Sequence, residues 1–591
     1  VKNYQARLLK ALGKAVPESP SKVLKKGHAT VDHKTISKIK KFLTKRDIDS
    51  INQGVELARA LENQALFEEL LKEVRYDKDA VDHRDYAFVV EQPSGALIPN
   101  KLFTGTGPAQ PYLDCAMIGL LNHASNDFAT ELQKEVKTLN SSCCLTEYYS
   151  NFTNIKKLRI YLDSNLPWEE QSLWHTPSLN GLSTLDRLTH LQIACGPKSD
   201  QNLQALSKCN NLVELALGKL ESLKSLSGLE ECGKLQIIEL SECTVLENID
   251  ALRGHDQLKS LQIHNADALK NLNGLKGCVA LEELNIVNAE SLENLDGLKG
   301  LKALKTINID DAKSLENLDG LNGCVSLKEL TIRGSYDARL PAKDIDGLKG
   351  LKALERVTLS GFHSLVNING FKGCSSLDDL ELSECDSLSN IDGLKKMKAL
   401  TSVRISAKTL KNVDGLSGCE NLNEFSVEGE ALENIDGLKG CHRIEKLDIP
   451  QSSKLQNLDA LADMKKLREI HFSRCNIKKL TLFTIEVPTV KKVLIENCDK
   501  LTSLEGFEQL INLAELRVRQ CPMLATLKGL EETKRLQLII VDDCGSLKNV
   551  DSLLNLSKLE TFKIHSCGIK KANLPAPLQV IVETRTSYQD W

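Results

Sequence analysis

Aromatic residues are scarce in this chain of 591 residues, where Trp, Tyr and Phe together make up 4%. This scarcity leaves few platforms on which nucleic-acid bases could stack, and it suits an aliphatic core. A strong excess of one charge is also missing, because the net charge is −4 and the pI is about 6.4. The chain as a whole is therefore not a polycation built for nucleic acid.

The sequence patterns of common enzymes and metal sites are missing as well. It contains no H-E-x-x-H, G-x-S-x-G or G-K-[ST] pattern, each of which would place specific groups for catalysis or phosphate binding. A C-x-x-C pair, the usual zinc signature, is absent too. We therefore expect no enzyme, no metal site and no cofactor. A nucleophile built from Cys143 or Cys144 with a histidine stays open as an alternative.

A repeat of 22–24 residues dominates what is present. The copy Leu281–Ala303 reads LEELNIVNAESLENLDGLKGLKA, and the next copy begins at Leu304 with LKTINIDDAKSLENLDGLNGC. Self-similarity of this period indicates stacked units that cannot bury their apolar faces alone. In L-x-x-L-x-I, the residues Leu284 and Ile286 alternate with polar positions, which predicts a strand with one buried face.

Nineteen copies can be counted from the first apolar residue of each L-x-x-L-x-L core. These markers are Ile155, Leu188, Leu212, Leu235, Leu258, Leu281, Leu304, Leu327, Leu354, Leu377, Leu400, Leu422, Ile444, Leu467, Val490, Leu513, Leu536, Leu559 and a degenerate Leu578. In the segment N-L-D-G-L, we expect residues such as Asp296 and Asp319 to cap a following short turn, and Gly297 to relieve crowding at the bend. We also expect Leu578–Val582 to form the last strand.

These copies resemble leucine-rich repeats, particularly the short repeats of internalin-like bacterial proteins. The resemblance covers about residues 150–585. It implies an α/β solenoid in the form of a leucine-rich-repeat arc, with a parallel β-sheet on the concave face and short helical or 3-10 turns on the convex face. The segment before the repeats also resembles the helical segments that precede the repeats in bacterial leucine-rich proteins. This resemblance implies an α-helical N-terminal domain.

Fourteen of the 18 cysteines keep a fixed phase with the repeat. Seven precede a marker by three residues, as Cys278 precedes Leu281, and seven follow one by eight, as Cys475 follows Leu467. We interpret them as small buried core residues, with disulfides between stacked coils as the alternative. Many free thiols indicate a reducing compartment, and no secretory signal or transmembrane run is visible. We therefore expect a cytoplasmic protein.

The chain before the repeats divides into a basic leader and a helical region. Residues 1–50 carry thirteen Lys or Arg against four Asp or Glu, a net charge of +9, and this leaves −13 for the rest. Apolar residues at helical spacing predict two or three short helices between Thr35 and Val74, then helices over Tyr112–His123 and Phe128–Val136. The predicted domains are a leader at 1–33, a helical cap at 34–150, the solenoid at 151–577, and a capping strand with tail at 578–591.

Binding residues are expected where core packing imposes no residue type. Those places are the outward strand positions and an inserted loop at Gly334–Lys343. Outward side chains mix acidic, basic and polar groups, a chemistry that fits a protein partner better than a phosphate backbone. Leu538 and Ile540 form a candidate apolar anchor near Leu494. The candidates are Glu283, Glu329, Arg333, Tyr336, Arg339, Arg356, Asp379, Glu381, Arg404, Glu424, Leu494, Arg517, Leu538 and Ile540.

The sequence therefore predicts a non-catalytic protein-binding scaffold that uses the outward repeat surface. Two alternatives stay open. The chain could be a structural subunit that self-associates, with the basic leader of one copy meeting the acidic remainder of another. The leader could instead anchor the chain to nucleic acid or to an anionic membrane. The partner's identity is not encoded in any motif that we recognise.

Overall fold

The structure is a computed structural model, and it describes most of the repeat region and part of the chain before it. The described residues are 33–43, 48–61, 63–71, 74–76, 88–91, 97–99, 110–124, 127–141, 146–160, 178–194, 200, 202–334, 340–452, 454–455, 458–475, 478 and 487–583. Two compact units divide the chain, Val1–Leu281 and Glu282–Trp591. Each unit is treated by itself below as the N-terminal or the C-terminal unit. The predicted domain boundaries at 33, 150 and 577 stay predictions.

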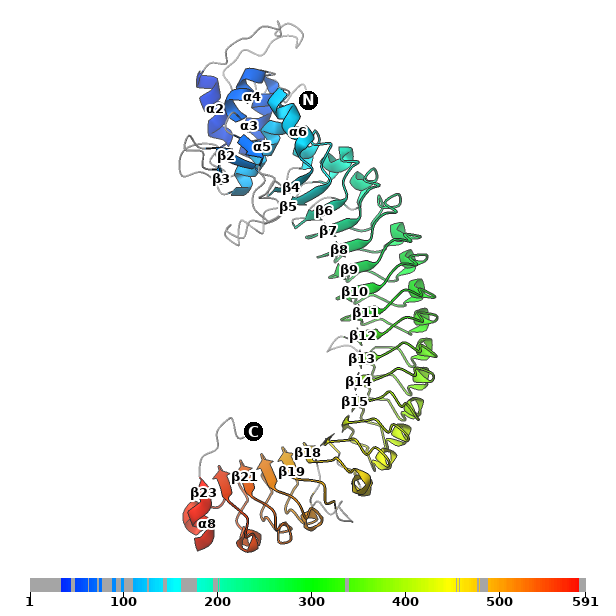
Figure 1. The fold of residues 1–591 in the computed structure, drawn as a ribbon, viewed down its shortest axis with the longest axis vertical. Helices are drawn as coiled ribbons and strands as arrows, with labels where there is room; N and C mark the ends of the chain where they lie inside the picture. The colour runs from blue at the N-terminus through cyan, green and yellow to red at the C-terminus, as the bar shows by residue number, and fades with distance from the viewer. Residues whose placement is uncertain are drawn as a thin grey trace. The chain divides into compact units, whose positions relative to one another are not determined.

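The N-terminal unit begins with helices, as the spacing of apolar residues predicts. Their bounds are α2 His33–Leu43, α3 Ile48–Ala60, α4 Gln64–Leu71, α5 Gln110–His123 and α6 Asp127–Glu135 (Figure 1). Ile39, Leu43, Ile51 and Val55 lie on the inner faces of α2 and α3 and are fully buried. α3 packs against both α2 and α5. Among the described helices, none has the length and apolar character needed to cross a bilayer.

A small antiparallel sheet accompanies these helices, which the sequence analysis did not predict. Its strands β1 Val74–Tyr76, β2 Phe88–Glu91 and β3 Leu97–Pro99 pair in chain order. The segment is rich in Gly and Pro and its strands are only three or four residues long, so the alternation of apolar residues was too brief to recognise.

The repeats of the N-terminal unit form a parallel sheet, with each described strand hydrogen-bonded to the next in sequence. The strands are β4 Thr138–Ser141, β5 Lys157–Ile160, β6 His190–Ile193, β7 Glu214–Leu217, β8 Ile237–Leu240 and β9 Ser260–His264. Strand β4 precedes the first repeat marker that we counted. Its core residues Val136 and Leu139 are fully buried, but Ser141 replaces the third apolar residue and hides the pattern.

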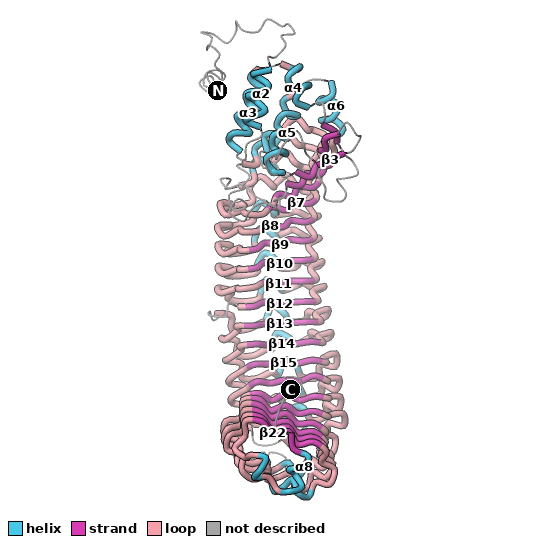
Figure 2. The backbone as a smooth tube through the Cα atoms, turned by 90° about the vertical axis from the view of Figure 1, so that its left-hand side faces the viewer, coloured by secondary structure: helices cyan, strands magenta, loops and turns pink. Residues whose placement is uncertain are grey.

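The C-terminal unit repeats the same parallel arrangement (Figure 2). Its strands are β10 Glu283–Val287, β11 Thr306–Ile309, β12 Glu329–Arg333, β13 Arg356–Ser360, β14 Asp379–Ser383, β15 Ser402–Ser406, β16 Glu424–Glu428, β17 Lys446–Pro450, β18 Glu469–Ser473, β19 Lys492–Glu496, β20 Glu515–Arg519, β21 Leu538–Asp542, β22 Thr561–His565 and β23 Val582–Glu583. Three-residue 3-10 turns such as η9, Asp319–Leu321, lie on the side of the coil opposite the strands. The predicted α/β solenoid with a parallel sheet and short 3-10 turns is confirmed.

A residue with left-handed backbone ends most of these strands. Asn288, Asp311, Arg474 and Asn497 have φ between 53° and 58°, and each stands seven residues after its marker. Such a φ reverses the chain direction and turns the following side chain into the core. The fourteen described cysteines are all unpaired thiols, and thirteen of them are buried. Their interpretation as core residues is confirmed, and the alternative of disulfides is not.

The caps of the 3-10 turns differ from the prediction. The carboxylates of Asp296 and Asp319 accept no hydrogen bond from the turn that they begin. Instead Asn317 Oδ1, two residues earlier, accepts the backbone N–H of Asp319 at 3.1 Å. Counting this coil, the same contact of an Asn or Asp side chain is found in eleven described coils. The side chain of this Asx turn thus satisfies the backbone N–H of the first residue of the 3-10 turn, which has no partner within the turn. The prediction that the Asp residues are caps was therefore wrong.

Glycine in this turn allows neighbouring coils to approach closely. A Cβ atom added at Gly320 would lie 1.9 Å from the carbonyl oxygen of Leu295 in the preceding coil. The same closeness recurs at Gly347 and Gly370, and none of these three glycines has positive φ. The glycine is therefore needed because the backbones of successive coils touch, rather than because the chain bends.

The C-terminal cap is a helix followed by a very short strand. Residues 576–581 form α8, Ala576–Ile581, and only Val582–Glu583 pair with β22. The prediction of a strand over Leu578–Val582 was wrong, because Pro577 lies in the first turn of α8, where its missing N–H and fixed φ favour a helix.

We expect Gly320→Ala to lower the free energy of unfolding by about 3 kcal/mol or more, because the new methyl group overlaps backbone that cannot move alone. Urea unfolding followed by circular dichroism measures this. Asp319→Ala, one residue earlier and exposed, is the matched control and should change the free energy by less than about 0.5 kcal/mol. Equal effects of the two variants would contradict the close-approach account.

We expect Asn317→Ala to weaken the turn locally by about 1 kcal/mol, the usual value of a side-chain cap. The amide of Asp319 should then exchange with solvent about fivefold faster, while Asp319→Ala leaves the exchange of the Leu321 amide unchanged. Hydrogen exchange of the peptide that contains η9 measures both. Faster exchange in the Asp319 variant alone would restore the aspartate to the capping role.

Candidate functional site: the strand face of the C-terminal unit

The outward side chains of β10–β22 form the surface that we call the strand face. In β10, Leu284 and Ile286 are buried, whereas Glu283 is exposed and Asn285 and Val287 are half-buried. This follows from the two-residue period of a strand, which sends alternate side chains to opposite faces. Within the C-terminal unit, Figure 1 shows the strands on the inner side of the curve. The strand face thus offers three side chains per coil with no role in the core.

Charged residues in the middle of this face lie beside one another in adjacent strands. The register aligns Glu329, Arg356, Asp379, Ser402 and Glu424 in one row. Arg356 pairs with Glu329. From the next row, Arg404 reaches Asp379 Oδ1 with Nη1 at 3.5 Å and Glu424 Oε2 with Nη2 at 2.7 Å. We call these six residues the central cluster.

One polar atom of the central cluster has no hydrogen-bond partner, although it is buried. It is Oγ of Ser402, and Ser402 as a whole is only 8% exposed. An unsatisfied buried polar atom costs about 1–3 kcal/mol, so such atoms call for an explanation. An arriving donor or acceptor that met the Ser402 hydroxyl would recover part of that cost.

A second group of charges alternates in sign along the same row of strands further on. Lys446 Nζ lies 2.9 Å from Glu469 Oε1, and Lys492 Nζ lies 3.7 Å from both Glu469 Oε2 and Glu515 Oε1. Arg517 Nε donates to Glu515 Oε1 at 2.5 Å. Partial burial raises the pKa of Glu469, but the contacts from Lys446 and Lys492 outweigh it and leave the pKa below its ordinary value. We call these five residues the charge ladder.

A histidine with two acidic neighbours lies beside the charge ladder. His471 Nδ1 is 3.2 Å from Asp448 Oδ1, and its Nε2 is 3.4 Å from Glu496 Oε2. The hydrogen bond to Asp448 raises the pKa of His471 and outweighs partial burial, which lowers it. The imidazole is oriented by carboxylates on both sides.

The structure brings together some of the predicted residues and separates others. Glu329, Arg356, Asp379, Arg404 and Glu424 meet in the central cluster, and Arg517 belongs to the charge ladder. Glu381 accepts a hydrogen bond from Ser383 Oγ at 3.4 Å in the row of Arg404. Glu283 and Arg333 are exposed at the ends of their strands. Tyr336 and Arg339 lie outside the described residues.

The predicted apolar anchor is not present. Ile540 is 1% exposed, so its place in an exposed patch was wrong, while Leu538 and Leu494 are half-buried. Register places Arg517 between Leu494 and Ile540. The apolar residues are therefore interrupted by a guanidinium group and do not form one surface.

Sequence reasoning also missed residues that complete the face. Lys446, Glu469, Asp448, His471 and Glu496 were not among the candidates, although they occupy the same outward positions. The signal that could have found them is the alternation of Lys and Glu at the first strand position, in steps of 23 residues from Lys446 to Glu515. Like-positioned residues in adjacent coils are neighbours in a parallel sheet, so opposite charges at this spacing predict ion pairs.

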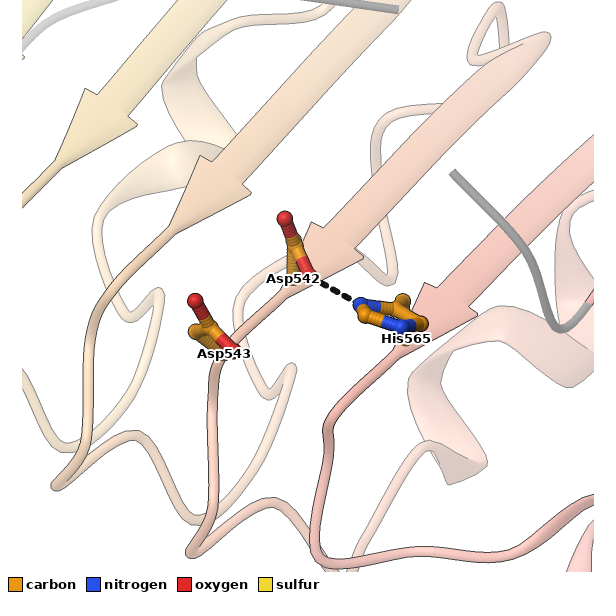
Figure 3. A group of neighbouring side chains, drawn as sticks. All are labelled: Asp542, Asp543 and His565. Carbon is orange, nitrogen blue, oxygen red and sulfur yellow. Dashed lines mark hydrogen bonds and ion pairs between the residues drawn. The ribbon is translucent and has the colours of Figure 1, made fainter. Parts of the chain in front are cut away.

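A group of possible metal ligands lies at the end of the strand face (Figure 3). Ligand atoms of Asp542, Asp543 and His565 all lie within 4.8 Å of one another. The two best-placed groups already bind each other, because His565 Nδ1 is 2.9 Å from Asp542 Oδ1. Arg519 Nε lies 3.8 Å from the other Asp542 oxygen, and a fixed positive charge there opposes a second cation. We interpret this group as an ion-pair cluster.

The N-terminal unit contains a polar cleft of about 560 Å³. Asn52, Glu56 and Arg59 of α3 line one side, and Asn122 and His123 of α5 line another, with Tyr148 beside them. Tyr148 Oη donates to Asn52 at 2.7 Å, and Arg59 Nη1 lies 3.1 Å from Glu56. Burial and Arg59 lower the pKa of His123 against the opposing effect of Glu56. These groups bind one another and fix the helices onto the first coil.

Comparison with known proteins agrees with this geometry. The family described as the BspA type leucine rich repeat region matches residues 348–468 and 465–588, with six copies. No match was found among curated proteins. Solved structures that resemble the chain include a Leptospira interrogans leucine-rich-repeat protein, LIC12759, at 18% identity. The match covers 64% of this chain and 96% of that one, with a TM-score of 0.45.

Two further solved structures are similar to the chain at lower identity. One is the internalin InlF of Listeria monocytogenes, at 13% identity with a TM-score of 0.34, covering 65% of this chain and 82% of that chain. The other is the plant peptide hormone receptor RGFR1 in complex with RGF2, at 13% identity with a TM-score of 0.33, covering 73% and 89%. Residues 348–588 therefore match this repeat family, and the coil geometry described above is that of a leucine-rich-repeat solenoid.

Proposed function

We propose that the chain is a non-catalytic recognition scaffold that binds a protein partner through the strand face of the C-terminal unit. The observation that carries this proposal is the central cluster, where the buried hydroxyl of Ser402 lacks a hydrogen-bond partner beside half-exposed charges of both signs. The core fixes the residues that point inward, whereas nothing in the fold requires charged groups at these outward positions.

The ion pairs of the central cluster are of the kind that a partner can replace. The side chains of Asp379, Arg404 and Glu424 are 42%, 48% and 64% exposed, and pairs this exposed contribute only about 0–1 kcal/mol to stability. Their exchange for intermolecular pairs therefore costs the fold little. Complementary charges across an interface raise association rates and select partners, so mixed charge favours a protein surface that is itself of mixed charge.

The proposal includes a reducing, cytoplasmic location. Its support is the set of fourteen described cysteines, which are all unpaired thiols, because free thiols persist where glutathione and thioredoxin keep them reduced. Fluorescence microscopy of a tagged chain tests this, and secretion of the tagged chain would contradict it. Self-association and anchoring through residues 1–50 stay predictions, since residues 1–32 lie outside the described residues.

We expect Arg404→Glu to reduce recovery of the partner by roughly tenfold or more, because it places a third carboxylate between Asp379 and Glu424 and reverses the charge that a partner meets. Affinity capture from cell extract with the tagged full chain, followed by quantitative mass spectrometry, measures this recovery. Arg356→Glu and Glu381→Lys should act in the same direction.

The control for this experiment is Lys395→Glu, which makes the same change of charge on the opposite side of the coil. Lys395 is 51% exposed and pairs with Asp392 at 3.0 Å, so its exposure and pairing resemble those of Arg404. Both variants should keep the circular dichroism of the parent. Recovery that is equal in the Arg404 and Lys395 variants would reject the central cluster as the binding site.

A further inference from the structure

Five cysteines stack in consecutive coils at the C-terminal end of the solenoid. Cys475, Cys498, Cys521, Cys544 and Cys567 are each 23 residues apart, and we call them the thiol ladder. Each follows by two residues the last strand residue of its coil. Those last residues are aligned by register, as Arg519 is with Asp542 and Asp542 with His565. Neighbouring rungs are therefore about one strand spacing apart, ~4.8 Å, within the Cα separation that a disulfide spans.

The thiols interact with one another as well as with the backbone. Neighbouring thiols of the ladder lie close enough to shift one another's pKa, from Cys475 to Cys567. Cys567 Sγ also donates to the carbonyl of His565 at 3.1 Å. Cysteines at the same repeat position elsewhere have no such neighbour. Cys385, for example, lies between coils that place Phe362 and Ala407 at that position.

The last rung differs from the others in its access to solvent. Cys475, Cys498, Cys521 and Cys544 are buried, but Cys567 is partly exposed. The reason lies in β23, which pairs with β22 only at Phe562 and Lys563. Among the described residues, the end of β22 and the turn that carries Cys567 therefore have a strand on one side only, and this coil can shift toward its neighbour more easily than an interior coil can.

We infer that Cys567 and Cys544 are an oxidation site, in which a peroxide enters at Cys567 and a reversible disulfide to Cys544 locks the last coil. This inference is independent of the proposed binding function, because it uses core thiols at the end of the solenoid rather than the strand face.

The chemistry is a two-electron oxidation of two thiols by one peroxide molecule. The Cys567 thiolate attacks one oxygen of hydrogen peroxide, the O–O bond breaks, and hydroxide leaves, so that Cys567 becomes a sulfenic acid. The Cys544 thiolate then attacks that sulfur, the S–O bond breaks, a second hydroxide leaves, and the disulfide forms. The two thiol protons neutralise the two hydroxides, so the products are one disulfide and two water molecules.

The roles of the two sulfurs follow from their surroundings. Hydrogen bonds from the Cys521 and Cys567 thiols lower the pKa of Cys544, against burial that raises it. Donation to Cys544, together with burial, raises the pKa of Cys567. Cys544, buried in the neighbouring coil, is the thiol placed to resolve a sulfenic acid, while the exposure of Cys567 makes it the point of entry. The raised pKa of Cys567 makes the first step the slow one, and it should speed up as the pH rises.

The test is peptide mapping of the reduced full-length chain after treatment with hydrogen peroxide and alkylation of the remaining thiols. Trypsin releases Cys544 in the peptide 536–548 and Cys567 in 564–570. We expect these two peptides linked, with a mass two hydrogens below their sum, and separated by dithiothreitol. Cys567 should be consumed roughly tenfold or more faster than Cys475 and Cys385, because reaction with peroxide follows exposure.

Two variants and one control distinguish this route from general oxidation. Cys544→Ser should leave a sulfenic acid on Cys567 that dimedone traps, and Cys567→Ser should abolish oxidation of Cys544. Cys385→Ser removes a thiol without a stacked neighbour and should change neither result. In the oxidised parent chain, amide exchange over residues 561–568 should slow and should recover after reduction. Irreversible sulfinate at Cys567 without the cross-link, or equal oxidation of Cys385, would overturn the inference.

Discussion

Contact between the backbones of successive coils is the constraint on which this structure depends. One coil presents a row of apolar side chains that it cannot bury, and the neighbouring coil buries them only if the two approach closely. The approach is so close at the turn that Gly320 has no room for a Cβ beside the Leu295 carbonyl. Residues that face inward are therefore fixed by geometry, and the strand face is the part of each coil on which sequence can vary freely.

The same stacking arranges the charges of the strand face. Because strands pair in register, residues 22–27 apart in sequence become neighbours, and opposite charges at equivalent positions form pairs without any dedicated loop. Arg404 between Asp379 and Glu424 and Lys492 between Glu469 and Glu515 arise in this way. Such exposed pairs stabilise the fold little. We therefore interpret them as features of a binding surface rather than as contacts that stabilise the solenoid.

The period of the repeat was enough to place the strands, but it did not predict the local chemistry of the turns or the ends. The Asp of each N-D-G-L turn looked like a cap by residue type, yet Asn317 takes that role because an Asx side chain reaches the amide two residues ahead. Leu578 looked like a strand marker, but Pro575 and Pro577 start a helix there. Ile540 was predicted to be exposed because it occupies an outward position of its strand. Its burial depends on the side chains around it, and the repeat period gives no information about those. The positions of the central cluster could be predicted from the repeat, whereas the buried, unpaired hydroxyl of Ser402 required coordinates.

The first and last coils of a stack each have an apolar face that no further coil covers. The two units cover these faces with different elements. In the N-terminal unit, α3 and α5 pack beside the first coils, and the hydrogen bond from Tyr148 to Asn52 joins helix to coil. In the C-terminal unit, α8 and a strand of two residues are the described cap, which leaves the end of β22 without a partner strand. An interior coil has a neighbouring coil on each side, and its thiol is buried. The terminal coil carries a cysteine at the same repeat position, but among the described residues a complete coil covers it on one side only. A residue that is structural everywhere else in the solenoid thereby becomes chemically accessible at the last coil, without any change in its local sequence pattern.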